Sequence, residues 1–253
     1  MGDLTTLLSD ARRVLIFTGA GISTGSGIPD YRGPQGTWTT RQPTTYQRFM
    51  ASDEGRREYW DYKLEAWDAW RDAEPNATHR ACVELERAGR LAMVVTQNVD
   101  GLHTKAGTSP SKLVELHGTN NAVECQSCGR RSDPGEHFEQ FRATGEPPVC
   151  DCGGFLKPAT ISFGQSLRLD DIERAQEAAL ACDLVLSLGS TLGVYPAAGI
   201  PLIAANNGAP YVIINRGQTD HDGMDEVTLR LEGDVAEIFP PAVDSALASH
   251  KGA

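Results

Sequence analysis

The sequence contains no long apolar segment, which argues against a membrane-spanning helix. Its 253 residues are 40% hydrophobic, and apolar runs such as Val14–Phe17 and Leu184–Leu188 are far shorter than the roughly 20 residues that a membrane helix needs. Basic residues are also scarce, since 23 Lys and Arg stand against 34 Asp and Glu, a net charge of −11. This imbalance argues against a broad nucleic-acid-binding surface.

The first residues lack the basic, apolar and small-residue order of a secretory signal. We therefore expect a reducing, cytoplasmic compartment, in which the six cysteines bind a metal or lie in the core rather than form disulfides. The length and composition are those of a globular protein with one large domain or two smaller ones.

Short apolar runs separated by helical patterns predict an α/β fold with a Rossmann-like doubly wound parallel sheet, because strands buried on both faces are nearly continuously apolar. Helices are predicted over Thr78–Ala88 and Asp171–Cys182, and after a capping box at Asp234, with Pro240 and Pro241 interrupting that last helix. The predicted strands are Val14–Thr18, Ala92–Thr96, Ala159–Phe163, Leu184–Ser190, Tyr211–Asn215 and Val227–Leu231.

Two segments interrupt this alternation. The four tryptophans fall within residues 33–72, which predict a loop followed by a helical insertion. Residues 120–157 hold four of the six cysteines and few large aliphatics, too few to fold by hydrophobic burial alone. We therefore expect three parts: a Rossmann-like domain formed by residues 1–37, 74–119 and 158–253, a cofactor loop and helical insertion at 38–73, and a small zinc-binding module at 120–157.

Two close cysteine pairs, Cys125 with Cys128 and Cys150 with Cys152, predict a zinc site. Four thiolates can occupy the corners of a tetrahedron around Zn²⁺, and they leave no open coordination position, so the metal is expected to be structural. The alternative is four unrelated buried thiols. The other two cysteines, Cys82 and Cys182, lie in helical patterns and are expected in the core.

Polar or glycine-rich segments follow the first two predicted strands. The glycine-rich turn from Gly19 to Gly25 suits the approach of a pyrophosphate, or is an ordinary tight turn. Its third glycine comes one residue later than in the pattern G-x-G-x-x-G, by which many dehydrogenases bind a dinucleotide. This difference argues against a hydride-transfer dehydrogenase. The polar segment Thr96–His103 suits a pocket at the carboxyl end of a strand, or is a solvated loop. Taken alone, His117 is more often structural than catalytic.

In this order, these motifs resemble the sirtuins, the NAD-dependent protein-lysine deacylases, over about residues 10–240. The motifs that carry the resemblance are Gly19–Ser23, Gly27–Arg32, Thr96–His103, His117-Gly118, the four-cysteine segment and Phe163-Gly164. The resemblance implies that the acyl group of an acyl-lysine protein is transferred to ADP-ribose, with release of nicotinamide.

The resemblance also implies residue roles. His117 would be the general base, with Asn98 beside it at the ribose. The cysteines Cys125, Cys128, Cys150 and Cys152 would bind zinc, and Ile161, Phe163 and Gly164 would line the acyl-lysine channel. The expected NAD contacts are Gly19, Ala20, Gly21, Ser23, Asp30, Tyr31, Arg32, Gln97, Asn98, Asp100, Gly189, Ser190, Thr191, Asn215, Arg216 and Val235.

Two other functions remain open. A protein mono-ADP-ribosyltransferase would use the same chemistry at the ribose, but it would not need the base that His117 supplies. A non-catalytic zinc-module protein that binds NAD or ADP-ribose would need neither His117 nor Asn98 nor Asp100.

The helical insertion carries the expectation about the acyl group. Family members that prefer succinyl-lysine or malonyl-lysine have a Tyr followed three residues later by an Arg, which pairs with the distal carboxylate. Here Tyr59 is followed by Tyr62, and Tyr62 by Glu65, a carboxylate that would repel an acidic acyl chain. Lys63 would point about 100° away from Tyr62 on a helix. We therefore expect acetyl-lysine to be processed faster than succinyl-lysine.

Overall fold

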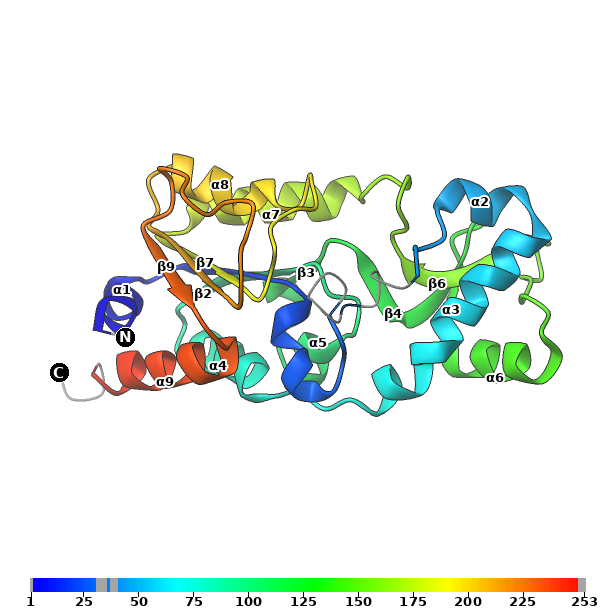
Figure 1. Ribbon diagram of the computed structural model, residues 1–253, viewed down its shortest axis with the longest axis horizontal. Coiled ribbons are helices and arrows are strands. Elements are labelled where there is room, and N and C mark those ends of the chain that lie inside the picture. The colour runs from blue at the N-terminus through cyan, green and yellow to red at the C-terminus, as the bar shows by residue number, and fades with distance from the viewer. Residues whose placement is uncertain (1, 31–35, 37–40, 250–253) are drawn as a thin grey trace.

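The computed structural model describes residues 2–30, 36 and 41–249. Its main feature is a six-stranded sheet of order β3-β2-β1-β7-β8-β9 (Figure 1), in which every neighbouring pair is parallel. The predicted doubly wound parallel sheet is therefore confirmed. Its strands are β1 (Val14–Thr18), β2 (Leu91–Thr96), β3 (Leu113–Glu115), β7 (Leu184–Leu188), β8 (Tyr211–Asn215) and β9 (Leu229–Glu232).

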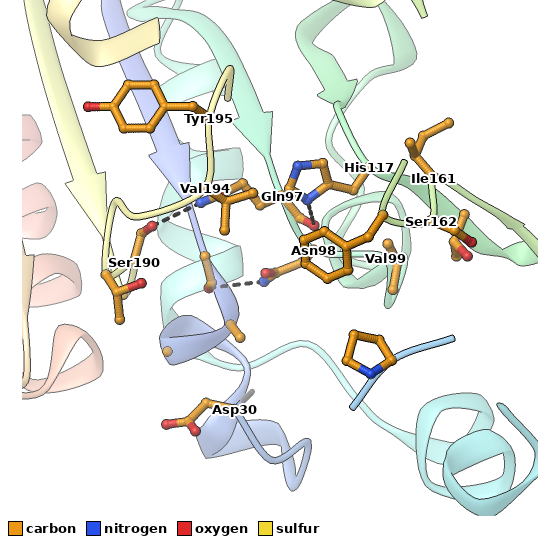
Figure 2. A pocket seen from close by; sticks show the side chains of 18 of the residues that line it. Asp30, Gln97, Asn98, Val99, His117, Ile161, Ser162, Ser190, Val194 and Tyr195 are labelled. Atoms are coloured by element: carbon orange, nitrogen blue, oxygen red, sulfur yellow. Dashed lines mark hydrogen bonds between the residues drawn. The ribbon is translucent and has the colours of Figure 1, made fainter. Parts of the chain in front are cut away.

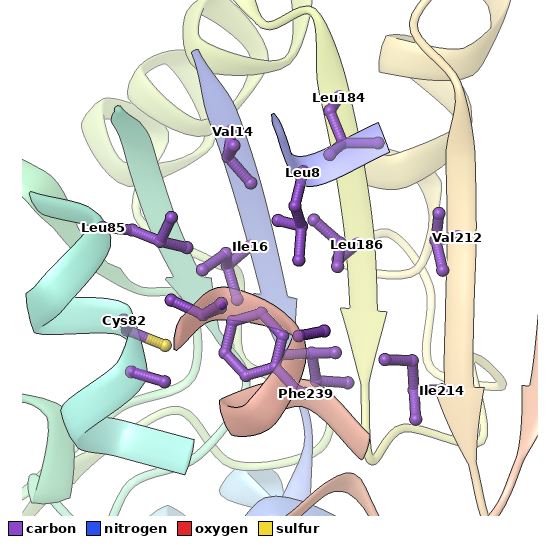
Figure 3. Packing of buried hydrophobic residues seen from close by; sticks show 14 of the residues in the cluster. Leu8, Val14, Ile16, Cys82, Leu85, Leu184, Leu186, Val212, Ile214 and Phe239 are labelled. Carbon is purple, nitrogen blue, oxygen red and sulfur yellow. The ribbon is translucent and has the colours of Figure 1, made fainter. Parts of the chain in front are cut away.

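Helices cover both faces of this sheet. On one face, α1 (Gly2–Asp10), α4 (Ala77–Arg87) and α9 (Val235–Ala248) bury residues such as Leu8 and Phe239 against the strands (Figure 3). On the other face, α7 (Leu169–Ala181) and α8 (Gly199–Asn206) contribute small residues to a second apolar cluster. The two layers bury both sides of the strands, as the nearly continuous apolar runs predict.

A smaller unit lies at one end of the molecule (Figure 1). Its antiparallel sheet, of order β5-β4-β6, is packed with the helices of the insertion. Trp60 and Trp67 from the insertion contact Phe138 from the cysteine segment, and the rings of Trp67 and Phe138 stack with centroids 4.2 Å apart. The insertion and the cysteine segment therefore share one hydrophobic core. The elements of this unit are α2 (Tyr46–Ala51), α3 (Asp53–Asp72), β4 (Gly118–Cys125), β5 (Arg131–Ser132), α6 (Pro134–Thr144) and β6 (Leu156–Thr160).

Short turns and helices connect the larger elements. None of the helices in the described residues combines the length and the apolarity that crossing a bilayer requires. The connecting elements are η1 (Ala20–Ile22), η2 (Thr24–Ser26), α5 (Leu102–Ala106) and η4 (Pro110–Lys112).

One predicted strand is assigned to the wrong sheet. Residues Ala159–Phe163 were expected in the parallel sheet, but the structure has β6 at Leu156–Thr160, antiparallel to β4 in the small sheet. The sixth strand of the parallel sheet is instead β3, which has three residues and is too short to show a strand pattern. An apolar run indicates a buried strand, but it does not indicate which sheet the strand joins.

The two prolines do not interrupt the last helix, contrary to the prediction. Helix α9 continues through Pro240 and Pro241, although each lacks an N–H group and crowds the preceding turn. Its N-terminus begins as predicted at Asp234, whose side chain accepts a hydrogen bond from Ala236 N. The buried face that includes Phe239 and Val243 packs in the core and stabilises the helix across the prolines.

A buried histidine pair gives the fold an expected acid sensitivity. The rings of His79 and His103 lie 4.9 Å apart, and burial lowers the pKa of His79 to about 4 and that of His103 well below its usual value. In the unfolded chain, each histidine takes up a proton near pH 6.5, whereas in the folded protein it does so only at lower pH. The two neutral histidines therefore contribute their full stabilisation above pH 6.5, and this stabilisation is lost as the pH falls toward the pKa of the folded state.

We therefore expect the free energy of unfolding to fall between pH 6.5 and 4, with His79 contributing about 3 kcal/mol at most. Urea unfolding of the wild type and of His79→Gln across this range measures the contribution. The variant should show a shallower pH dependence, while His137→Gln should change the slope less, because burial lowers the pKa of the half-buried His137 to a smaller extent. An unchanged slope in His79→Gln would contradict the assignment.

Candidate active site

A cavity with a volume of about 890 Å³ lies at the carboxyl ends of the central strands. Strand β1 pairs with β2 on one side and with β7 on the other, so the chain crosses over in opposite directions from this point. Open α/β sheets bind their ligands at such a switch point. The cavity is large enough for a dinucleotide together with a second substrate group.

The glycine-rich turn after β1 packs directly on the loop after β7. Gly21 N donates a hydrogen bond to Gly189 O at 2.8 Å. A Cβ on Gly19 would lie 2.7 Å from Gly189 O, and one on Gly21 would lie 2.7 Å from Gly189 Cα. Both glycines are therefore required by the close approach of the two loops. The turn continues into the short 3₁₀ turns η1 and η2.

Asn98 is held by a hydrogen-bond network behind the cavity wall. Its Nδ2 donates to Gly19 O at 3.1 Å and to Ser23 Oγ at 3.2 Å, and the first of these bonds is drawn in Figure 2. Ser23 Oγ in turn donates to Asp100 Oδ2 at 2.7 Å. Burial raises the pKa of Asp100, partly offset by hydrogen bonds from Leu102 N and Ser23. The network fixes the orientation of the Asn98 amide at the cavity.

His117 lines the cavity with one ring nitrogen already bonded. Its Nδ1 lies 3.1 Å from Gln97 O (Figure 2), and because a carbonyl oxygen only accepts, Nδ1 carries the proton. The Nε2 lone pair is then free in the neutral ring. Burial lowers the pKa of His117, partly offset by the Gln97 carbonyl. At neutral pH the imidazole is therefore uncharged, and its Nε2 is able to accept a proton as a base.

The far side of the cavity is formed by the loops after β7 and β8. Gln97 Nε2 donates to Ser190 Oγ at 2.9 Å across the sheet (Figure 2). Arg216 forms an ion pair with Asp234 at 2.6 Å, which joins the loop after β8 to the N-terminus of α9. These polar side chains all line the cavity.

The segment after β6 forms the opposite side. Ile161 N donates to the carbonyl oxygen of His117 at 2.7 Å, and Tyr46 N donates to Phe163 O at 3.0 Å. Gln47 Nε2 donates to Gly164 O at 2.9 Å. Phe163 lines the cavity and remains 41% exposed, so part of the lining is an apolar ring that solvent can reach.

The four predicted zinc ligands are grouped in the small unit. All four Sγ atoms lie within 4.8 Å of one another, and the Cys125–Cys152 and Cys128–Cys150 distances are 3.5 and 3.9 Å. Tetrahedral Zn–S bonds of about 2.3 Å place sulfur atoms about 3.8 Å apart. Backbone N–H groups of Cys128 and Ser127 lower the pKa of Cys125 to about 6, which favours the thiolate. The donor set fits a closed structural zinc site.

The structure brings most of the predicted site residues together. Tyr31 and Arg32 lie outside the described residues. Ser23 and Asp100 lie behind the wall, whereas the other residues predicted to contact NAD or acyl-lysine, within the described part of the chain, line the cavity. The predicted core residues Cys82 and Cys182 are buried. The predicted residues that line the cavity are Gly19, Ala20, Gly21, Asp30, Gln97, Asn98, His117, Ile161, Phe163, Gly164, Gly189, Ser190, Thr191, Asn215, Arg216 and Val235.

Sequence reasoning missed part of the wall. Val194 and Tyr195, which follow β7, line the cavity (Figure 2). Pro196, and Leu167 and Ile172 near the start of α7, line it as well. Neither group forms a sequence motif. The sequence indicates only that the first group follows a predicted strand and that the second lies at the start of a predicted helix.

Comparison with known proteins agrees with this geometry. The model of the Sir2 family matches residues 19–196. The chain belongs to the Sir2 family. Its Sir2 relatives include the "NAD-dependent protein deacetylase" of Rhodopseudomonas palustris, 40% identical over 95% of this chain and 94% of the relative. Another is "NAD-dependent protein deacetylase 2" of Streptomyces coelicolor, 43% identical over 86% of this chain and 91% of the relative.

Solved Sir2 structures share the whole fold. A structure described as Sir2 with a p53 peptide and NAD⁺ is 32% identical, with a TM-score of 0.86, and covers 100% of this chain and 99% of that one. The likeness therefore extends over both the large sheet and the smaller unit.

Proposed function

We propose that this Sir2 protein is an NAD-dependent protein-lysine deacetylase. The observation that carries the proposal is the position of His117. Its Nε2 is unprotonated, and the cavity that it lines includes both the switch point of the sheet and the apolar ring of Phe163. The relatives named as NAD-dependent protein deacetylases support the same activity.

NAD supplies the anomeric carbon from which nicotinamide leaves, and the ADP-ribose that accepts the acyl group. The loops after β1 and β7 hold its phosphates through backbone groups at Gly19–Gly21 and Gly189, while Asn215 and Arg216 frame the adenosine. Asn98 and Gln97 position the ribose. These roles follow the family resemblance, and the cavity lining supports them.

His117 takes a proton from a ribose hydroxyl at Nε2. Gln97 O holds the ring through Nδ1, so the base is oriented before the substrate binds, and this preorganisation lowers the cost of reaching the reactive geometry. On the acyl side, Ile161, Phe163 and Gly164 contact the acyl-lysine, and the peptide around it pairs as an added strand.

Ser23 positions the amide of Asn98 and the carboxylate of Asp100, which is proposed to hold the carboxamide of nicotinamide. Ser23→Ala removes the hydroxyl that joins them. We expect kcat/KM for an acetyl-lysine peptide to fall about 10-fold, the effect of one hydrogen bond to a charged group. Steady-state kinetics measure the loss, and circular dichroism checks that the variant is folded. Unchanged kinetics would show that the network is not needed.

We propose that the chain works in the cytoplasm as two functional parts. The Rossmann-like domain of residues 1–37, 74–119 and 158–253 carries NAD, and the insertion at 38–73 acts with the zinc module at 120–157. The shared core of insertion and module supports the pairing of these two parts. A reducing compartment keeps the zinc-binding thiols reduced, which supports the cytoplasmic location.

Mass spectrometry of one reaction tests the proposed activity. The protein is incubated with NAD and an acetyl-lysine peptide, and the expected products are the unmodified peptide, nicotinamide and O-acetyl-ADP-ribose in equal amounts. A peptide that gains ADP-ribose would instead identify a transferase. Binding of NAD without turnover would identify a non-catalytic protein, and either result would contradict the proposal.

A further inference from the structure

His221 is a fully buried histidine that has no part in the chemistry proposed above. It lies in the segment of residues 216–228 between β8 and β9 and is 0% exposed. Both of its ring nitrogens are bonded to tyrosine hydroxyls, Nδ1 to Tyr211 Oη at 3.0 Å and Nε2 to Tyr195 Oη at 3.2 Å. A neutral imidazole offers one donor and one acceptor, and a hydroxyl can serve as either, so both bonds are satisfied together.

The bond to Tyr211 fixes His221 to the large sheet. Tyr211 is a fully buried residue of β8, and its hydroxyl lies 3.0 Å from Ser187 Oγ on β7. These two strands are neighbours in the sheet. A buried polar network in which each of these side chains has a partner favours a single arrangement. The position of the His221 ring is therefore set by two strands of the core.

The bond to Tyr195 reaches the cavity wall. Tyr195 is 58% exposed and lines the cavity. It belongs to the loop of residues 189–198 after β7, which also carries Ser190 and Thr191, two of the proposed NAD contacts. Figure 2 shows Ser190, Val194 and Tyr195 along this stretch of chain. His221 thus connects the core of the sheet to a loop that faces the cofactor.

The backbone of this loop is strained at Leu192. Its φ is +58°, a positive value that no other non-glycine residue has in the described part of the chain. A residue with a Cβ adopts this conformation only where surrounding contacts hold it. Leu192 N donates to Ser190 Oγ at 3.1 Å, so the strained conformation also sets the position of the Ser190 hydroxyl.

Two successive residues of the β8–β9 segment hold the loop on either side of Leu192. Before it, Thr191 O accepts a hydrogen bond from Asp220 N at 2.9 Å. After it, the Tyr195 hydroxyl is bonded to His221. The two segments are also in close contact between these points, since a Cβ on Gly193 would lie 3.0 Å from Asp220 Oδ2. The bond at His221 is therefore one of two hydrogen bonds that flank the strained residue.

We propose that His221 is a positioning residue for NAD, which holds Tyr195 and thereby keeps the loop after β7 in the strained conformation that presents Ser190 and Thr191 to the cofactor. This inference rests on the place that the proposed function gives to NAD in the cavity. A loop that has the binding conformation for only a fraction of the time lowers the apparent affinity by that fraction. His221 does not line the cavity, so its loss should affect cofactor binding more than the chemical step.

Two replacements of His221 separate its two bonds. The amide of Asn reaches about as far as Nδ1, so His221→Asn keeps a partner for Tyr211 and loses the bond to Tyr195. The longer Gln reaches the position of Nε2, so His221→Gln keeps the bond to Tyr195. In calorimetric titrations with NAD, we expect His221→Asn to bind about 3- to 10-fold more weakly, the effect of one neutral hydrogen bond. His221→Gln should recover most of the affinity, and in both variants kcat should change less than the KM for NAD.

Tyr195→Phe removes the same bond from the exposed side and leaves the buried residues unchanged. It should weaken NAD binding as much as His221→Asn does, and the double variant should be no weaker than either single one, because both changes remove one interaction. Hydrogen exchange of the amides in residues 190–196 should become faster in these variants. His137→Asn, which changes a histidine that does not line the cavity, is the matched control and should alter neither measurement.

Equal NAD affinity in the wild type, His221→Asn and Tyr195→Phe overturns the inference and leaves the proposed deacetylase function intact. Additive losses in the double variant, or a loss in His221→Gln as large as that in His221→Asn, also overturn it, because His221 then acts through packing and not through Tyr195. The expected pattern of NAD affinities in a protein that does not process the acetyl-lysine peptide supports the inference, and only the proposed function then fails.

Discussion

Replacing His117 by Ala is expected to lower kcat for an acetyl-lysine peptide by about 10²- to 10⁴-fold, the usual contribution of a general base. The fold should survive, because the side chain lines a cavity and has one described hydrogen bond, to Gln97 O. NAD affinity should change much less than kcat, since other residues are proposed to hold the dinucleotide. Steady-state kinetics and calorimetric titration with NAD separate the two effects.

The pH profile of the wild type gives a second readout of the same residue. The base must be unprotonated, and burial lowers the pKa of His117, so activity should persist below pH 6.5 before it falls in acid. His137→Ala, which changes a histidine of the small unit away from the cavity, is the matched control and should keep both rate and profile. If His117→Ala retains more than about a tenth of wild-type turnover, the role assigned to His117 is wrong.

The sequence predicts those parts of the fold that depend on local pattern. Strands β1 and β8 occur at the predicted residues because five consecutive buried positions require an apolar run. The cysteine cluster is also predictable, since the spacing within each pair already brings two sulfur atoms together. The three-residue strand β3 and the sheet membership of β6 depend on long-range pairing, and no local pattern contains that information.

The site divides in the same way. The loops after β1, β2 and β7 could be placed at one sheet edge, because parallel strands have their carboxyl ends on the same side. The direction in which each side chain points could not be predicted from the sequence. The Ser23 side chain lies behind the cavity wall and contacts Asn98 and Asp100. Lys63 lines the cavity because it shares a helix face with Tyr59. A comparison of Lys63 with Tyr62 alone, as made from the sequence, misses this position.

Removal of zinc is expected to abolish deacetylation while NAD binding is largely kept. Structural zinc in small modules contributes about 10 to 16 kcal/mol to folding, more than a segment poor in apolar residues can replace. Cys125 and Cys150 belong to the same buried cluster as Trp60, and Trp60 Nε1 donates to Leu156 O at 3.1 Å. Loss of the metal therefore loosens α3 and β6 together.

This coupling connects the metal site to the acyl channel, because α3 and β6 carry Tyr59 and Thr160. The loops after β1 and β7, which are proposed to hold the phosphates of NAD, belong to the large sheet, which has its own cores on both faces. Elemental analysis should find one zinc per chain in untagged protein. After chelation, or in Cys128→Ser, acetyl-lysine turnover should be lost while calorimetry still detects NAD binding.

Cys82→Ala provides the matched control, because Cys82 is a buried free thiol outside the metal cluster. It should retain both zinc and activity, which separates loss of the metal from loss of a cysteine in general. Zinc-free protein that keeps full turnover would show that the shared core of Trp60, Trp67 and Phe138 holds the acyl channel without the metal. Loss of NAD binding and turnover together would show that the large sheet also depends on the zinc module.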